Sequence, residues 1–266
     1  MKKQLIAIVC ILLVILAIIS AMILNRPEDP SVPVVTDPPV VEVYEKIAVK
    51  DVEKISLETV NVNVTVALSD DNNIHIVYKP FTDEEHFQYE FVDKNLSLKI
   101  EKVNISGFLV PSDNEMIYLL LPKKSNVEFS FKTESGFVLM DEVNLKNITI
   151  ISTSGVIAIT DVNVEEILQI ETVSGMIALR DNSFASLNLL ANSSLVSCSI
   201  ADYESSFKNN FATETGSIVV NGMDVETPYC GVENCEMVEE EKPITNITTK
   251  SGNIILKFLV EEDEIE

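Results

Sequence analysis

Short alternations of apolar and polar residues dominate the chain from Tyr44 onward. The segments 60–66 and 96–100 carry an apolar residue at every second position. This period is typical of strands that bury one side. We find no convincing long amphipathic helix pattern after residue 24, and 82–91 is the one ambiguous stretch. The pattern predicts an all-β domain over residues 44–258.

A short internal repeat is the strongest pattern in this domain. A Ser-Gly-like pair recurs along it with successive spacings of 19, 20, 19, 22 and 36 residues. The second residues of these pairs, which we predict to be the rung corners, are Gly136, Gly155, Gly175, Ser194, Gly216 and Gly252. Two positions after each corner lies a β-branched residue, and these predict a core column of Val138, Ile157, Ile177, Val196, Ile218 and Ile254.

Other positions in the repeat are equally regular. The residues four after and five before each corner are apolar, and those three before it are small. Two strands with one apolar side cannot bury that side within a repeat of about 20 residues, so the repeats must stack. We therefore predict a short β-solenoid, a right-handed β-helix with rungs of about 19–22 residues. Ser106-Gly107 is not counted as a rung, because Pro111 takes the position four after it, which is apolar and strand-forming in the other repeats. An irregular rung is expected at Ser194 and in the 36-residue interval.

The corner residues carry their own expectations. Glycine permits a positive φ at a tight corner, and the small residues three positions earlier leave room for the bend. Asp141, Asp161 and Asp181 follow the second strand of their repeats and predict the next turn.

These motifs support a resemblance to a known family. The run 116–122, which ends in Leu-Pro, is followed by Ser135-Gly136 and the later Ser-Gly rungs. In this it resembles a bacterial family of proposed adhesins with a β-helix fold, over roughly residues 44–258. The resemblance implies a surface or envelope-associated role, in adhesion or envelope-stress signalling, and supplies no catalytic residues.

The first 43 residues predict how the domain is held. Residues 5–24 are apolar except for Ser20 and follow Lys2 and Lys3, which favours an uncleaved transmembrane anchor with a cytoplasmic N-terminus. A long cleaved signal peptide is the alternative. Residues 25–43 are rich in proline and predict a semi-rigid stalk, or a disordered linker with the same role. The predicted organisation is a cytoplasmic tip (1–4), an anchor (5–24, Leu5 to Leu24), a stalk (25–43), an extracellular solenoid (44–258) with an insertion (221–243), and an acidic tail (259–266).

Composition narrows the partners. The chain has 266 residues, 42 of them acidic and 19 basic, for a formal net charge of −23. Nucleic-acid binding needs clustered Lys and Arg, so this charge argues against it and against anionic lipid surfaces. The expected partners are the membrane, through the anchor, and a surface protein or glycan of unknown identity, with no small-molecule substrate.

The insertion carries Cys230 and Cys235 beside the acidic run 239–241. Outside the cell, two cysteines five positions apart favour a small disulfide loop over a metal site, which would need further ligands. Such a loop could recognise a partner or be a tolerated insertion without a role. Cys198 falls in an apolar column, which favours an inert buried thiol over a reactive one.

Groups that could perform catalysis are scarce. The chain has two histidines, His75 and His86, and no tryptophan. Both histidines, and the acidic pair Asp70-Asp71, are interpreted as solvated surface, so we expect no cofactor, metal or catalytic residue. The favoured function is therefore a membrane-tethered, non-enzymatic interaction or scaffold protein. A polysaccharide-active β-helix enzyme is the alternative, supported by fold analogy alone.

Overall fold

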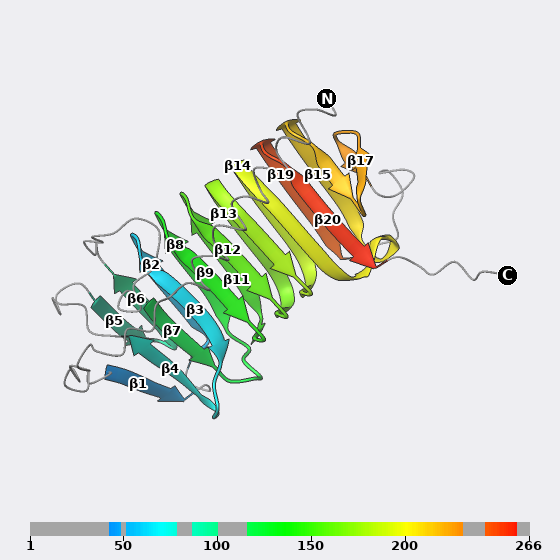
Figure 1. Ribbon diagram of the computed structural model, residues 1–266. Coiled ribbons are helices and arrows are strands. Elements are labelled where there is room, and N and C mark those ends of the chain that lie inside the picture. The colour runs from blue at the N-terminus through cyan, green and yellow to red at the C-terminus, as the bar shows by residue number, and fades with distance from the viewer. Residues whose placement is uncertain (1–42, 49–51, 79–86, 101–115, 231–242, 260–266) are drawn as a thin grey trace, which may run out of the picture. The chain divides into compact units, whose positions relative to one another are not determined.

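The computed structural model describes residues 43–48, 52–78, 87–100, 116–230 and 243–259 (Figure 1). All of them belong to one compact unit, residues 41–266. This unit is all-β, and its described helical element is a single 3₁₀ turn, η4 (Glu204–Ser206). No helix in these ranges is long and apolar enough to cross a bilayer. The predicted anchor and stalk lie outside the described residues.

Hydrogen bonds join the strands into one curled sheet with two layers. In spatial order the first layer contains β5 (Phe87–Val92), β6 (Asn95–Ile100), β2 (Lys54–Thr59), β8 (Glu128–Thr133), β11 (Asn147–Ser152), the first half of β13 (Asn163–Arg180), the first half of β14 (Ser183–Tyr203), β19 (Ile244–Ser251), β15 (Lys208–Thr215) and β18 (Tyr229–Cys230). Every pairing from β6 to β15 is parallel, and the outermost strands β5 and β18 are antiparallel to their neighbours.

The second layer follows the same plan. It contains β1 (Val43–Ala48), β4 (Asn73–Tyr78), β7 (Met116–Leu121), β3 (Asn63–Leu68), β9 (Phe137–Asp141), β12 (Val156–Thr160), the second halves of β13 and β14, β20 (Ile254–Leu259), β16 (Ile218–Val220) and β17 (Met223–Val225). Pairing is parallel from β7 to β16, whereas β1, β4 and β17 pair antiparallel. At one corner β10 (Asn144–Leu145) pairs with the start of β13.

One strand from each layer makes a rung, and the described strands form eight stacked rungs (Figure 1). In spatial order the rungs are β6–β7, β2–β3, β8–β9, β11–β12, β13, β14, β19–β20 and β15–β16. Ile150 lies beside Ile170, which lies beside Leu189, so consecutive rungs here are 20 and 19 residues apart along the chain. The fold is therefore a β-solenoid; its handedness remains a prediction.

Inward side chains of both layers fill one hydrophobic core. The predicted column lies in register in the second layer, with Val138 beside Ile157, Ile177 and Val196, and then Ile254 beside Ile218. Each of these six side chains is at most 2% exposed. A solenoid of this kind stacks like on like, so β-branched residues meet β-branched neighbours across the whole sheet.

The order of the rungs departs from the order of the sequence at both ends. The rung β19–β20 lies between β14 and β15–β16, so Gly252 stacks on Ser194 and the earlier rung of Gly216 lies outside it. At the other end β2–β3 lies between β6–β7 and β8–β9. Every repeat satisfies the same column pattern, so the repeat alone does not report which rungs are neighbours.

Two sequence expectations need correction here. Residues 60–66 are not one alternating strand, because the chain turns a corner at 60–62, where Asn61-Val62 takes the place of a Ser-Gly pair. The rung at Ser194 is regular, since Ser193 and Ser194 pair in register with Ser174 and Gly175. The rung β2–β3 is not visible in the Ser-Gly repeat, because its corner carries neither glycine nor a hydroxyl residue.

The glycine corners bring successive backbones very close together. Gly155 and Gly175 have φ values of 126° and 125°. A Cβ added to Gly155 would lie 2.0 Å from the carbonyl oxygen of Gly136, and one added to Gly175 would lie 2.1 Å from that of Gly155. Only glycine tolerates both the positive φ and this close approach.

The turn after the second strand of these rungs contains a residue with a positive φ, but this residue is not always the predicted aspartate. Asp161 and Asp181 have φ values of 52° and 55°. In their sister rung the left-handed residue is Glu142, with φ of 55°, and the predicted Asp141 is the last residue of β9. The turn lies six positions after the corner in all three rungs, so the offset decides its place rather than the aspartate.

A column of buried hydroxyl groups, interrupted by one alanine, supports the corners. Its members, in spatial order, are Thr59, Thr133, Ser152, Thr172, Ala191, Thr249 and Thr213. The hydroxyl of Thr172 donates to the carbonyl oxygen of Ser174 at 2.9 Å, and Ser152 does the same to Ser154 at 2.8 Å. In three rungs the small residue three before the corner therefore does more than leave room: the hydroxyl groups of Thr133, Ser152 and Thr172 bind the carbonyl of the residue just before the corner.

Replacing Thr172 with Val should lower the free energy of unfolding by about 1 kcal/mol, because the partly buried carbonyl of Ser174 loses this donor. Thr172→Ser keeps the donor and should stay within about 0.5 kcal/mol of the native protein. Urea titration followed by circular dichroism measures both. Equal stability of the Val and native proteins would show that the hydroxyl column contributes only its small volume.

Candidate functional site

The outward side of the first layer carries an ordered row of uncharged polar side chains. Six of these residues lie six positions before a predicted corner, and Ser56 and Ser97 pair in register with them. In spatial order the row is Ser97, Ser56, Ser130, Thr149, Gln169, Asn188, Asn246 and Asn210. Hydroxyl groups occupy one half of the row and amides the other. We call this set the amide–hydroxyl row.

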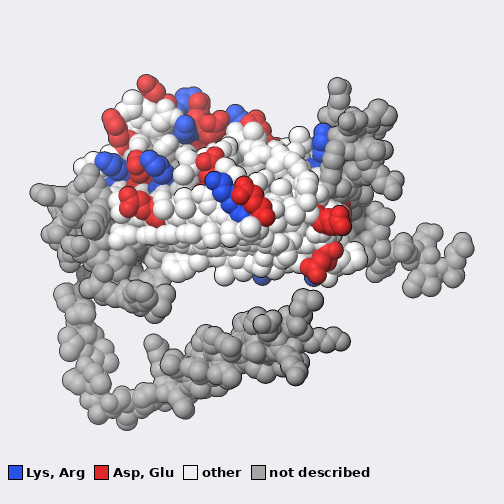
Figure 2. Space-filling view, turned by 90° about the horizontal axis from the view of Figure 1, so that it is seen from above, with Lys and Arg blue, Asp and Glu red and all other residues white. Residues whose placement is uncertain are grey.

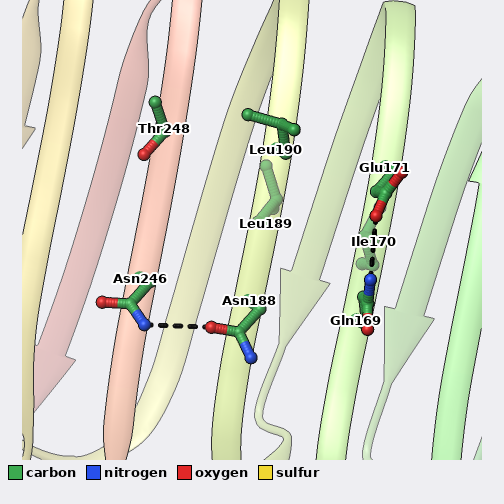
Figure 3. A pocket seen from close by; sticks show the side chains of 8 residues that line it. All are labelled: Gln169, Ile170, Glu171, Asn188, Leu189, Leu190, Asn246 and Thr248. Carbon is green, nitrogen blue, oxygen red and sulfur yellow. Dashed lines mark hydrogen bonds between the residues drawn. The ribbon is translucent and has the colours of Figure 1, made fainter.

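A hollow of about 200 Å³ opens over the amide half of the row (Figure 3). The Nδ2 of Asn246 donates to the Oδ1 of Asn188 at 2.9 Å, and the Nε2 of Gln169 donates to Glu171 at 2.8 Å. The side chain of Leu190, 50% exposed, adds an apolar patch beside these amides. The hollow thus offers donors and acceptors next to an aliphatic surface, in a repeat set by the strand spacing of about 4.8 Å.

A second hollow of about 520 Å³ lies near the other end of the same layer. Its charged lining residues are Glu58, Lys99, Lys132 and Glu134. The Nζ of Lys132 is 3.4 Å from Glu58, and both side chains are more than half exposed. Exposed ion pairs of this kind contribute little to stability. Because the lining has two acidic and two basic residues, this part of the layer is balanced in charge rather than acidic.

The predicted disulfide loop lies mostly outside the described residues. Cys235 is among the residues not described, and of Cys230 only the backbone is described, as the end of β18. The described part of the insertion does not project, because β17 and β18 pair antiparallel with β16 and β15. The ring of Tyr229 stacks on Phe211 at 5.8 Å and its hydroxyl donates to Glu204 at 2.5 Å. This part of the insertion therefore caps the last rung.

The remaining candidate groups are placed as follows. Cys198 is 2% exposed, and burial raises the pKa of its thiol to about 12, so the thiolate needed for reaction is scarce. His86 lies outside the described ranges. Within those ranges no group of three or more His, Cys, Asp or Glu side chains could hold a metal ion. The rung corners and the core column are structural positions and touch neither hollow.

His75 contacts Asp71, which the sequence did not predict. Its Nε2 is 2.8 Å from Asp71 in the turn between β3 and β4, and the backbone N–H of Asn73 also donates to Asp71 at 2.8 Å. The hydrogen bond with His75, followed by those from Asn73, holds the pKa of the Asp71 carboxyl well below its ordinary 3.8. His75 and Asp71 therefore form a turn contact rather than two independent solvated groups.

Replacing His75 with Ala should raise the pKa of Asp71 back toward 3.8, because the largest cause of its depression is removed. A carboxyl whose pKa is lower in the folded state stabilises the fold above pH 3.8 and loses that contribution as the pH falls below it. NMR titration of the Asp71 carboxyl carbon measures the shift, with Asn72→Ala in the same turn as control. An unchanged titration of Asp71 in the His75→Ala variant would exclude the contact with His75.

The fold and these surfaces together define a class: a β-solenoid with a regular row of uncharged polar side chains on one outward side. The chain belongs to the Toastrack DUF4097 family, whose profile matches residues 52–266. This match confirms the family resemblance carried by the Ser-Gly rungs.

Solved structures similar to this chain come from several bacteria. A proposed cell adhesion protein from Clostridium sporogenes is 17% identical, with a TM-score of 0.45, covering 82% of this chain and 100% of that one. A proposed adhesin from Bacteroides fragilis is also 17% identical, with a TM-score of 0.38, covering 82% and 97%. A proposed lipid-binding protein from Parabacteroides distasonis is 11% identical, with a TM-score of 0.32, covering 82% and 97%. Curated protein sequences contain no match to the chain.

The amide–hydroxyl row was missed by the sequence reading, although its signal was present. Six positions before each corner stand Ser130, Thr149, Gln169, Asn188, Asn210 and Asn246. The apolar and small columns of the repeat do not include this position, but its residues are uncharged and polar in all six repeats, which is the signal of the row.

Proposed function

We propose that this protein is a membrane-tethered, non-enzymatic interaction protein at the cell surface, adhesin-like, whose amide–hydroxyl row binds a neutral glycan. The observation that carries the proposal is the row itself: a repeated set of uncharged donors and acceptors on a chain of net charge −23. A role in envelope-stress signalling, through contacts with other membrane proteins, belongs to the same proposal.

The chemistry of the row favours hydroxyl-rich ligands. Asn and Gln side chains both donate and accept, as sugar hydroxyl groups do. Exposed aliphatic side chains beside them, Leu190 and Ile167 at 50% and 42% exposure, can cover the apolar faces of sugar rings. A solenoid also presents such contacts along an extended line, which suits a polymer.

Binding of the full chain to an array of neutral hexose and N-acetylhexosamine oligosaccharides tests this function. The double variant Asn188→Ala, Asn246→Ala removes two adjacent amides and should weaken binding roughly tenfold or more, at about 1 kcal/mol per hydrogen bond. Asn163→Ala, an exposed amide at a corner outside the row, is the matched control. Absence of binding to every neutral glycan, or equal binding by the double variant and the control, would reject the row as a glycan site.

The tether is tested separately. Full-length protein should sediment with membranes, and a variant lacking residues 5–24 should be recovered in the soluble fraction. Protease added to intact cells should digest the domain of the full-length protein. Recovery of the full-length protein in the soluble fraction would contradict the anchor without touching the glycan proposal.

A further inference from the structure

The outward side of the second layer differs from that of the first, because its two central rows carry no charged residue on the eight rungs. Asp224 of β17 lies just beyond them, in register with Val219. One row, one position after each corner, contains Phe137, Val156, Met176, Leu195, Asn253 and Ser217. The next row contains Tyr118, Thr65, Leu139, Ala158, Ala178, Ser197, Ile255 and Val219. We call these two rows the uncharged face.

Many of these side chains are apolar and accessible. Met176 is 45% exposed, Ile255 41%, and Phe137 and Leu195 each 37%. Val156 of β12 lies between Phe137 and Met176, and Leu195 and Ile255 follow on the next two strands, so these residues form one continuous patch rather than scattered surface residues. Contiguous exposed apolar patches of several hundred Å² usually mark an interaction site.

Charge is distributed unevenly over the solenoid. Figure 2 shows charged side chains gathered over part of the surface, and a band without them that runs along the stack. The third outward row of the second layer, beside the uncharged face, contains Asp141, Arg180 and Lys257, which are charges of both signs. An acidic protein repels its own copies over most of its surface, and least where such charges are absent or balanced.

We propose that the uncharged face binds a second copy of this chain, giving a two-fold dimer in which the second layers pack against each other. Two sheets pack face to face at about 10 Å, with interdigitating apolar side chains. A two-fold axis places the same patch on both sides of the interface, so charges of both signs at its edge can pair with each other. A partner of strong charge would gain nothing from the central rows.

The size of the face suits a reversible dimer. Six rungs at ~4.8 Å and three outward rows at ~6.7 Å, which are the uncharged face and the third row beside it, measure about 29 by 20 Å, or roughly 600 Å² per copy. The buried total of about 1,200 Å² lies at the small end of stable interfaces. Tethering to one membrane would raise the effective concentration of such a weak pair. In this dimer the amide–hydroxyl row of each copy stays accessible, so the dimer presents two glycan-binding rows.

Photo-crosslinking of the full chain in the cells that express it tests the dimer. A benzoylphenylalanine in place of Met176 should give a product of twice the chain mass. The same substitution of Leu190, which is 50% exposed on the first layer, is the matched control and should give little of it. Adding Ala178→Glu to the Met176 probe brings two like charges together across the interface and should reduce the double-mass product at least tenfold.

Each other outcome overturns the proposal. Crosslinks from position 176 to lipid or to a different protein would assign the face to that partner instead. A product of equal yield from positions 176 and 190 would mean unspecific collision. Undiminished yield with Ala178→Glu, in a variant whose circular dichroism is native, would place the contact elsewhere.

Discussion

Replacing Ile177 with Asp is expected to unfold the solenoid. The side chain is 1% exposed and lies between Ile157 and Val196 in the core column. The substitution removes a packed aliphatic group and places a carboxylate among the apolar side chains of the core, at a cost of several kcal/mol. Because whole domains are stable by only about 5–15 kcal/mol, one such change is sufficient.

Met176→Asp is the matched control, because it introduces the same charge at the neighbouring position, which is 45% exposed on the outer side. Far-ultraviolet circular dichroism and urea titration compare the two. The Met176→Asp variant should keep the strand signal, and the Ile177→Asp variant should lose it. If both variants were equally folded, the inward and outward assignment of β13 would be wrong.

Replacing Gly155 with Ala is expected to be the next most damaging change. The residue has φ of 126°, and the added Cβ would lie 2.0 Å from the carbonyl oxygen of Gly136 in the neighbouring rung. The positive φ alone costs about 1–2 kcal/mol. Relieving the clash moves backbone rather than a flexible side chain, so we expect a total loss of about 3 kcal/mol or more.

Gly222→Ala separates the two causes. Gly222 also has a positive φ, of 83°, but nothing lies within 4 Å of the Cβ that would be added. This variant should lose only about 1 kcal/mol. Equal losses in the two variants, measured by urea titration, would show that the stacking distance at Gly155 is less restrictive than the geometry indicates.

Sequence patterns predicted the local design of this domain well. The two-strand repeat, the core column and the all-β class follow from the period of apolar residues, because a buried side recurs at every second position whatever the neighbouring rungs are. Cys198 was placed in the core by the same rule, and it is buried there. The sequence predicted only that the position three before each corner is small. Residue types at a fixed spacing indicate side-chain size, but they do not indicate which carbonyl a hydroxyl group reaches.

The possible sites were less accessible to the same reasoning. Asp71 and His75 were each interpreted as solvated, whereas the turn brings them to 2.8 Å. Nor did the sequence show that the first part of the insertion caps the last rung through β17 and β18. In both cases the deciding contact depends on how a turn closes, which the alternation of residue types does not specify.

What the sequence by itself determined is the rung: its length, its corner glycines, and which residues point into the core. Those properties depend on residues close together in the chain and on a repeat that every rung satisfies. What only the tertiary structure decided is the order of the rungs at the two ends, and with it the neighbours in each outward row. Asn188 meets Asn246 across 58 residues of sequence because β19 inserts beside β14. Rungs with the same apolar columns can stack in more than one order, so the order depends on how the chain packs at the ends of the stack.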